Sequence, residues 1–331
     1  MALTLARPVG GARMGPMALL CAALSAATLL LPLLALSSQG GGLAWPDLAD
    51  PLTQALRVPR ILTALTVGAA LAASGAALQA LFRNPLADPG LVGTSSGAAL
   101  AVVCVLALGA GSLSLPLAAF GGGLAATWLI LALSRLVRGG LAGLLLMGLV
   151  VGAFCGALIS LILFMSDDLT LRSASAWLAG NLAAATGERL IACTAAALAG
   201  LLLLLWIARD LDCLLLGEDA ARSLGVDVRR TRRLAAIGAA LATGGAVALS
   251  GVIGFVGMMV PNLVAVLVGG CRRRLILLSA WAGALFLLAA DTLARTLVWP
   301  VDLPVGLVAA FAGPPFFVWM FARQQRSLID G

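Results

Sequence analysis

Histidine, tyrosine and lysine are absent from this sequence of 331 residues, so all 21 basic side chains are arginines. Without lysine the chain has no phosphate-binding loop of the GxxxxGK[ST] form and no amine for a Schiff base. Without histidine it lacks the commonest general base and the commonest metal ligand. We therefore expect no catalytic residue, no metal site and no cofactor in this chain. If ATP drives its activity, a separate chain must bind the ATP and Mg.

Charge is also scarce, because only 11% of the residues are charged while 62% are hydrophobic. Soluble domains carry about 25% charged residues. A helix that crosses a lipid bilayer needs roughly 20 mostly apolar residues, and the chain has room for about ten such segments. The composition predicts an all-α, polytopic membrane protein.

The six cysteines are widely spaced and form no CxxC pair, so neither a disulfide framework nor a zinc site is expected. We interpret them as small buried hydrophobic residues. They are Cys21, Cys104, Cys155, Cys193, Cys213 and Cys271.

Hydropathy predicts a single transmembrane domain over residues 1–331, with a first helix at 17–37 and a core over 57–322. The first apolar run follows Arg7 and Arg13 and resembles a signal peptide, but it is longer than a typical hydrophobic signal region, and we expect it to be retained. The expected spans are 17–37, 61–81, 93–110, 114–134, 141–165, 190–208, 234–252, 254–270, 276–296 and 304–322.

Arginine placement predicts the orientation, because cytoplasmic loops are enriched in positive residues. With the N-terminus inside, 16 of the 21 arginines are cytoplasmic, and both termini lie in the cytoplasm. The five arginines on the outer side are Arg57, Arg60, Arg172, Arg189 and Arg295.

Two connections are longer than turns. The outer stretch 166–189 is expected to contain a short surface helix. The inner stretch 209–233 carries Glu218 and Asp219 before an alanine-rich turn that Gly225 ends, which predicts a short capped helix. A faint likeness between 57–165 and 230–322 suggests two weakly related halves, each with a glycine-rich span followed by a break, at Asn84-Pro85 and Pro261-Asn262.

Several ordered motifs carry a family resemblance over nearly the whole chain. They are RVPRILTALTVGAALAASGAALQALFRNPLADPGLVGTSSGAAL from Arg57 to Leu100, GEDAARSLGV from Gly217 to Val226, GFVGMMVPN from Gly254 to Asn262, and ADTLAR, DLPVG and GPPFF between Ala290 and Phe317. Together they resemble the FecCD-type permeases of ATP-driven (ABC, type II) importers of iron–siderophore complexes, haem and vitamin B12.

The resemblance implies ten transmembrane helices per chain and a homodimer with two ATP-binding subunits in a bacterial inner membrane. It also implies a periplasmic or lipid-anchored substrate-binding protein, and no nucleic-acid partner. The cargo would be a ferric siderophore first by family frequency, then haem, then cobalamin. Pairing of two different permease chains instead of a homodimer remains open.

The resemblance also implies that Arg57, Arg60 and Arg295 receive acidic residues of the binding protein. Guanidinium groups suit this because they grip carboxylates through two hydrogen bonds. Placement of these arginines at the lipid interface is one alternative. For Arg295, an ion pair with Asp291, four residues earlier, is another.

On the cytoplasmic side, the resemblance implies that a helix between residues 217 and 225 couples the permease to its ATPase. A solvated loop is the alternative. The expected coupling residues are Gly217, Glu218, Asp219, Ala221, Arg222, Leu224 and Gly225.

The break at Asn84 and Pro85 is expected to be a structural elbow beside the pathway, continued by Asp88 and Pro89, and a cytoplasmic gate is expected near Gly139 and Gly140. The sequence departs from many relatives at Asn262, Ala265 and Asp302, where His, Arg and Glu are frequent. Asn262 keeps hydrogen-bonding capacity and Asp302 keeps the charge, whereas Ala265 loses the contacts of the arginine.

Two other classes are weighed against an importer. An ion-coupled secondary transporter needs ionisable groups near the middle of the membrane, and Asp291 is the nearest candidate. An intramembrane enzyme needs a nucleophile with a base or a metal, which this composition does not supply.

Overall fold

The computed structural model describes residues 15–39, 42–43, 49–109, 115–134, 136, 140–183, 187–269, 271–298 and 300–329. Within them, seven helices are long and apolar enough to cross a membrane, and three shorter apolar helices cover Thr94–Ala107, Val256–Val268 and Val305–Met320. The expected all-α polytopic fold is confirmed. Besides helices, the described residues contain one two-stranded antiparallel pair, β1 (Ser38–Gln39) with β2 (Gly42–Leu43).

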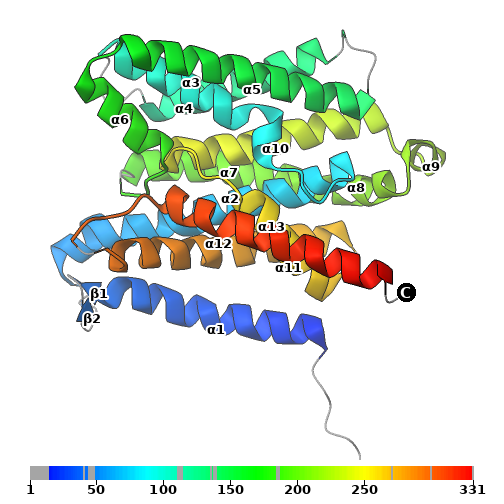
Figure 1. Cartoon of the computed structure of the whole chain (residues 1–331). Helices are drawn as coiled ribbons and strands as arrows, with labels where there is room; N and C mark the ends of the chain where they lie inside the picture. Colours follow the sequence, from blue (N-terminus) through cyan, green and yellow to red (C-terminus); the bar gives the residue numbers. More distant parts are fainter. Residues whose placement is uncertain are drawn as a thin grey trace, which may run out of the picture.

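The long elements follow the expected order along the chain (Figure 1). They are α1 (Pro16–Ser37), α2 (Val58–Phe82), α3 (Thr94–Ala107), α4 (Leu115–Leu133), α5 (Gly140–Met165), α7 (Gly187–Trp206), α10 (Val228–Ser250), α11 (Val256–Val268), α12 (Arg272–Thr296) and α13 (Val305–Ile329). The short helices are α6 (Asp168–Leu178), α8 (Ala208–Leu215) and α9 (Glu218–Ser223).

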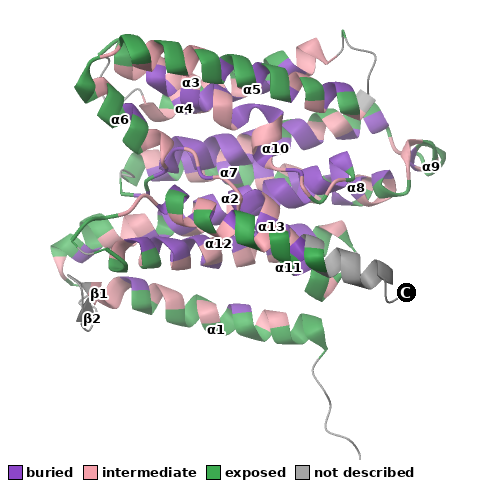
Figure 2. Ribbon diagram, viewed as in Figure 1, coloured by how far each residue is buried: buried purple, intermediate pink, exposed green. Residues whose placement is uncertain are grey.

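Helix α2 lies at the centre of the bundle and packs against α7, α10, α11 and α12. Helices α3, α4 and α5 pack together as a second group, which joins the first through α10. Helix α1 lies against α12, and α13 against α11 and α12. Figure 2 shows the buried residues concentrated in α2 and α10, while α1 and α5 are exposed along much of their length.

Glycines allow the central helices to approach closely. A Cβ added to Gly68 of α2 would overlap the carbonyl group of Gly283 in α12, and one added to Gly75 would overlap the carbonyl group of Gly257 in α11. In lipid there is no hydrophobic exclusion to hold helices together, so small residues that permit backbone contact supply the association. Gly68 and Gly75 of α2 therefore allow the close packing of α12 and α11 against this helix.

The break expected at Pro261-Asn262 is wrong, because Pro261 lies inside α11. A proline in a helix cannot donate to the carbonyl four residues earlier, which here belongs to Gly257, and that carbonyl group lies against Gly75 of α2. The chain turns earlier instead, between the end of α10 and Phe255, which has a φ of 67°. Helix α11 therefore continues through Pro261 without the hydrogen bond that the Gly257 carbonyl would otherwise accept.

Two further boundaries differ from the expectation. Residues Thr53–Arg57 form a π-helical turn that runs directly into α2, so Arg57 and Arg60 lie in a continuous helical segment and not just outside it. The inner connection contains two helices, α8 as well as the expected α9. Helix α6 confirms the short helix expected between residues 166 and 189.

The start of α1, the end of α13 and helix α9 lie at one end of the bundle, and β1, β2 and α6 lie at the other (Figure 1). Both ends of the described chain are therefore on one side, as an even number of spans requires. By the arginine distribution we expect the α9 end to face the cytoplasm. We refer below to the α9 end and the α6 end.

Candidate functional site

A compact charged cluster lies at the α6 end, around Asp291 of α12. The Asp291 carboxylate is 1% exposed and accepts hydrogen bonds from Nε of Arg60 at 3.0 Å and from Nη2 of Arg60 at 3.0 Å. It also forms an ion pair with Nε of Arg295 at 3.4 Å. Arg60 Nη1 donates to Asp302 at 3.0 Å, and the Asp302 side chain is 54% exposed. This cluster therefore ties α2 to α12 and to the connection before α13.

The two remaining contacts of the arginines reach the end of α1. Arg57 Nη1 donates to the carbonyl oxygen of Leu36 at 2.9 Å, and Arg295 Nη2 donates to that of Ala35 at 3.2 Å. The last carbonyls of a helix have no partner within the helix, and positive charge is favourable there. Arg57 and Arg295 thus act as a C-terminal cap for α1.

These contacts change how the three expected docking arginines are interpreted. The ion pair between Asp291 and Arg295, considered above as a competing use of Arg295, is present. Arg60 is fully engaged by two carboxylates, whereas Arg57 contacts a carbonyl oxygen and has no carboxylate partner among the described residues. Docking remains a prediction for all three, and Arg57 is the one of the three that forms no ion pair among the described residues.

At the α9 end, the expected elbow follows α2. Arg83 ends the helix with a φ of 48°, and the Asn84 side chain accepts a hydrogen bond from the N–H of Leu86 at 2.9 Å. Asp88 then caps a short 3-10 turn, Pro89–Val92, by accepting from the N–H of Gly90 at 2.8 Å. Burial raises the pKa of the Asp88 carboxyl, and the Gly90 hydrogen bond opposes that shift.

Two amides join the elbow and α2 to α11. Asn262 Nδ2 donates to the carbonyl oxygen of Pro85 at 2.7 Å and to that of Met258 at 2.8 Å, and Gln79 Nε2 also donates to Met258 at 3.0 Å. The asparagine that replaces a frequent histidine therefore keeps a structural hydrogen bond to the elbow. A pocket of about 360 Å³ adjoins these residues and is lined in part by Ala265 and Arg272.

Helix α8, which the sequence analysis missed, supports α12. Its Asp212 carboxylate accepts hydrogen bonds from the backbone N–H of Arg272 at 2.9 and 3.1 Å, at the first position of α12. The Arg272 side chain passes inward and donates to the carbonyl oxygen of Ala76 in α2 at 3.3 Å. Only eight residues long, α8 has too short an apolar pattern to stand out in the sequence.

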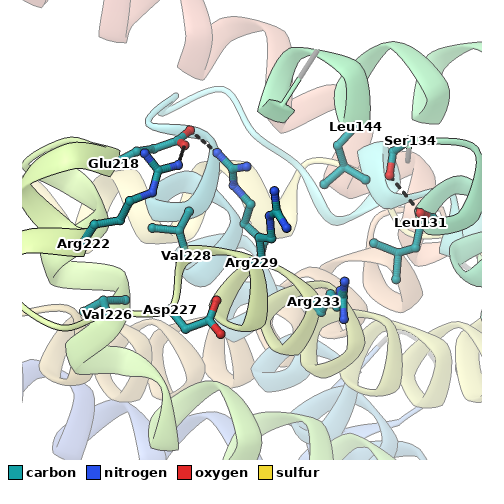
Figure 3. Close-up of a pocket in the computed structure, with 11 residues that line it drawn as sticks. Leu131, Ser134, Leu144, Glu218, Arg222, Val226, Asp227, Val228, Arg229 and Arg233 are labelled. Atoms are coloured by element: carbon teal, nitrogen blue, oxygen red, sulfur yellow. Dashed lines mark hydrogen bonds and ion pairs between the residues drawn. The ribbon is translucent and has the colours of Figure 1, made fainter. Parts of the chain in front are cut away.

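Helix α9 lies where the coupling helix is expected, and it confirms the short helix that the sequence indicated, although no described side chain caps its start. Gly217 precedes it with a φ of 116°, and Gly225 follows with a φ of 83°. Glu218 accepts from Arg222 at 3.1 Å (Figure 3). Glu218 also pairs with Arg232 of α10. Arg222 forms a second ion pair with Asp219 at 2.9 Å. Helix α9 is therefore fixed to the start of α10.

The residues of α9 differ in what they offer a partner. Ala221 is fully buried, so it packs inward and contributes no contact surface. Leu224 is 62% exposed, and Ala220 is half-buried. Of the expected coupling residues, Leu224 is therefore the one with an exposed apolar side chain to offer a partner. Of the expected gate residues, Gly139 lies outside the described residues and Gly140 begins α5.

The profile of the FecCD transport family matches residues 15–323 of this sequence. The chain belongs to the FecCD transport family. It is 44% identical over 279 residues to the hemin transport system permease protein HmuU of Yersinia pestis, covering 82% of this chain and 83% of that protein. It is 40% identical over 291 residues to the vitamin B12 import system permease protein BtuC of Vibrio cholerae, covering 86% of each chain.

A solved structure agrees with this membership of the FecCD family. The inward-facing conformation of a metal-chelate type ABC transporter superposes with a TM-score of 0.85 at 31% identity, covering 92% of this chain and 99% of that chain. The members to which the chain is similar are transport components, not enzymes. The chain is accordingly a multi-pass permease of this family.

Proposed function

We propose that this chain forms the membrane pathway of an ATP-driven importer for a metal chelate, in the inner membrane of a bacterium. Two copies would pair with two ATP-binding subunits, and a substrate-binding protein would deliver the cargo from outside. The observation that carries the proposal is the family match along 15–323 together with the likeness to a metal-chelate type ABC transporter. No P-loop is present in the sequence, so ATP and Mg would be bound by the partner subunits.

We further propose haem as the cargo, with cobalamin second. Supporting this order, the relative at 44% identity is named for hemin and the relative at 40% for vitamin B12. Both are large chelates that already supply ligands to their metal, which suits a chain without histidine or tyrosine. A ferric siderophore, expected first from family frequency, meets the same description and is the third arm of the test.

The arrangement at Asp291 argues against an ion-coupled carrier. Such a carrier needs a carboxyl group that is free to exchange a proton or a cation within the membrane. Asp291 was the nearest candidate, and it is held by Arg60 and Arg295 in ion pairs. Two guanidinium groups already contact this carboxylate, so any other cation would have to displace them.

Uptake in proteoliposomes tests the proposal. The permease, its ATPase and its binding protein would be reconstituted, and uptake of haem, cobalamin and a ferric siderophore would be measured with ATP inside and with ATP plus vanadate. We expect ATP-dependent, vanadate-sensitive uptake of haem. Uptake driven by an ion gradient without ATP would reject the importer class, whereas ATP-dependent uptake of another chelate would reject only the cargo.

A further inference from the structure

A basic pocket at the α9 end shares Glu218 and Arg222 with the expected coupling helix, but its other residues have no role in the function proposed above. Its volume is about 920 Å³, and it opens between the start of α10, the end of α4 and the start of α5. The residues that line it are Leu131, Ser134, Leu144, Glu218, Arg222, Val226, Asp227, Val228, Arg229, Arg232 and Arg233. Four arginines therefore face two carboxylates in one pocket.

The pocket has two unlike sides (Figure 3). Leu131 of α4 and Leu144 of α5 form an apolar wall, and Glu218 and Arg222 lie across the pocket from them. Arg229 and Arg233 lie between the two sides. A ligand that fills this space must be negatively charged at one part and apolar at another.

The carboxylates leave part of the positive charge uncompensated. Glu218 is shared between Arg222 and Arg232, and Asp227 caps α10 by accepting from the N–H of Arg230 at 3.0 Å. Arg229 and Arg233 have no carboxylate partner among the described residues. They are four residues apart on one helix face, an arrangement in which like charges repel.

A buried nitrogen also lacks a partner. Nε of Arg232 is shielded from solvent and makes no hydrogen bond within the described part of the chain. A buried donor without a partner is unfavourable, and more so when it carries a charge. Together with the unpaired charges of Arg229 and Arg233, which are exposed in the open pocket, it indicates that the pocket favours an anion.

The position of the pocket indicates what kind of anion it takes. Helices α4, α5 and α10 are all candidate membrane spans, and the pocket lies at their ends on the arginine-rich side. Arg230 turns away from the pocket and lies over the ring of Trp206 at 5.6 Å, and tryptophan is typical of the membrane–water boundary. The pocket therefore lies at the level of the lipid headgroups.

We propose that this pocket binds the phosphate headgroup of an anionic phospholipid from the cytoplasmic leaflet. Arg229, Arg232 and Arg233 hold the phosphate oxygens, for which guanidinium forks are well suited. The first part of an acyl chain covers Leu131 and Leu144. A free phosphate ion would leave that apolar wall uncovered, and a zwitterionic lipid would bring no net negative charge.

Lipid binding to the purified complex of the permease and its ATPase tests this proposal. The delipidated complex would be titrated with phosphatidylglycerol and with phosphatidylcholine, and bound lipid counted by native mass spectrometry. We expect the complex to prefer phosphatidylglycerol by roughly tenfold or more, since each basic residue near an anionic surface contributes about 1 kcal/mol. The double variant Arg229→Gln/Arg233→Gln should lose most of that preference.

The matched control is Arg273→Gln/Arg274→Gln, which removes two exposed arginines from the start of α12 outside the pocket. It should retain the preference. Equal loss in both double variants would overturn the proposal in favour of general surface charge. Displacement of phosphatidylglycerol by millimolar inorganic phosphate would indicate a soluble anion instead. If the pocket variant lost its ATPase but kept the lipid preference, the pocket would belong to the protein interface, and the proposal would be wrong.

Discussion

Arg60 and Asp291 are 231 residues apart in the sequence, yet Nε and Nη2 of the arginine each lie 3.0 Å from the aspartate oxygens. The pair joins α2, the central helix, to α12 at the α6 end of the bundle. Because Asp291 is 1% exposed and also contacts Arg295, one carboxylate neutralises much of the charge of two guanidinium groups. Asp291 thereby fixes the positions of Arg60 and Arg295, which we expect to face the binding protein.

Replacing Asp291 with asparagine should destabilise the protein strongly. Arg60 and Arg295 would keep their positive charges in a mostly buried site, and removing one partner of a buried ion pair costs about 3–5 kcal/mol. Thermal unfolding of the purified permease in detergent would measure the loss. Asp302→Asn serves as the control, because an exposed pair contributes only about 0–1 kcal/mol. Equal melting temperatures for the two variants would contradict the role of Asp291.

The variant Arg57→Glu tests docking to the binding protein with less effect on the stability of the fold than any change at Arg60 would have. Arg57 contributes one hydrogen bond to the end of α1 and no ion pair among the described residues, so the fold should be retained. If Arg57 receives an acidic residue of the binding protein, reversal of its charge should weaken that association by roughly tenfold or more. Binding to the reconstituted permease would be measured at low and high salt.

The control for Arg57→Glu is Arg172→Glu, which reverses an exposed arginine of α6 at the same end of the bundle. It should leave the association unchanged. Equal weakening in both variants would assign the effect to overall charge. Unchanged binding and uptake in Arg57→Glu would contradict the docking prediction.

The sequence was sufficient for those parts of the fold that depend on local pattern. Apolar runs of bilayer length place the long helices, and the glycine and carboxylate signals around Glu218 place α9. The four-residue spacing of Asp291 and Arg295 also made their ion pair foreseeable. These features depend on residues that are near one another along the chain.

Features that depend on distant segments could not be predicted in this way. Arg60 binds Asp291 only because the glycines of α2 let α12 approach, and nothing near either residue signals the partner. Pro261 suggested a break, but α11 continues through it and packs closely against α2 at Gly75 and Gly257. Ala221 looked available to a partner because an alanine on a short helix gives no sign of which face is buried.

Gly75→Ala should disrupt the contact between α2 and α11. The added methyl group would overlap the carbonyl of Gly257, which cannot move without shifting α11. Overpacking of this kind costs about 1–3 kcal/mol. Gly156→Ala in α5 is the matched control, since nothing lies within 4 Å of its added methyl group. That variant should be neutral or slightly stabilising by the higher helix propensity of alanine. A similar melting temperature for both variants would refute the close packing at Gly75.

Leu224→Asp should impair coupling without unfolding the protein. Leu224 is 62% exposed at the end of α9, so a polar replacement removes little internal packing. If the side chain enters an apolar groove of the ATPase, aspartate should reduce both assembly with that subunit and ATP-dependent uptake. The conservative variant Leu224→Met has a similar volume and polarity, so it should retain both assembly with the ATPase and ATP-dependent uptake. Normal assembly and uptake in Leu224→Asp would remove α9 from the coupling interface, at least at this residue.

Changes at Asp88 should separate its hydrogen bond from its charge. Asp88→Ala loses the acceptor for the Gly90 N–H, and loss of such a cap costs about 1 kcal/mol. Asp88→Asn keeps an acceptor oxygen and removes the charge.

Because burial raises the pKa of Asp88 above 3.8, the unfolded chain releases this proton at lower pH than the folded chain. The contribution of Asp88 to stability therefore falls as pH rises above 3.8, until the folded protein also loses the proton. Melting temperatures would be measured between pH 4 and pH 8. The melting temperature of Asp88→Asn relative to that of the wild type should rise as the pH rises. Asp88→Ala should melt below Asp88→Asn at every pH. If the melting temperature of Asp88→Asn relative to the wild type rose instead as the pH fell, the prediction would be wrong, and the Asp88 carboxylate would stabilise the elbow.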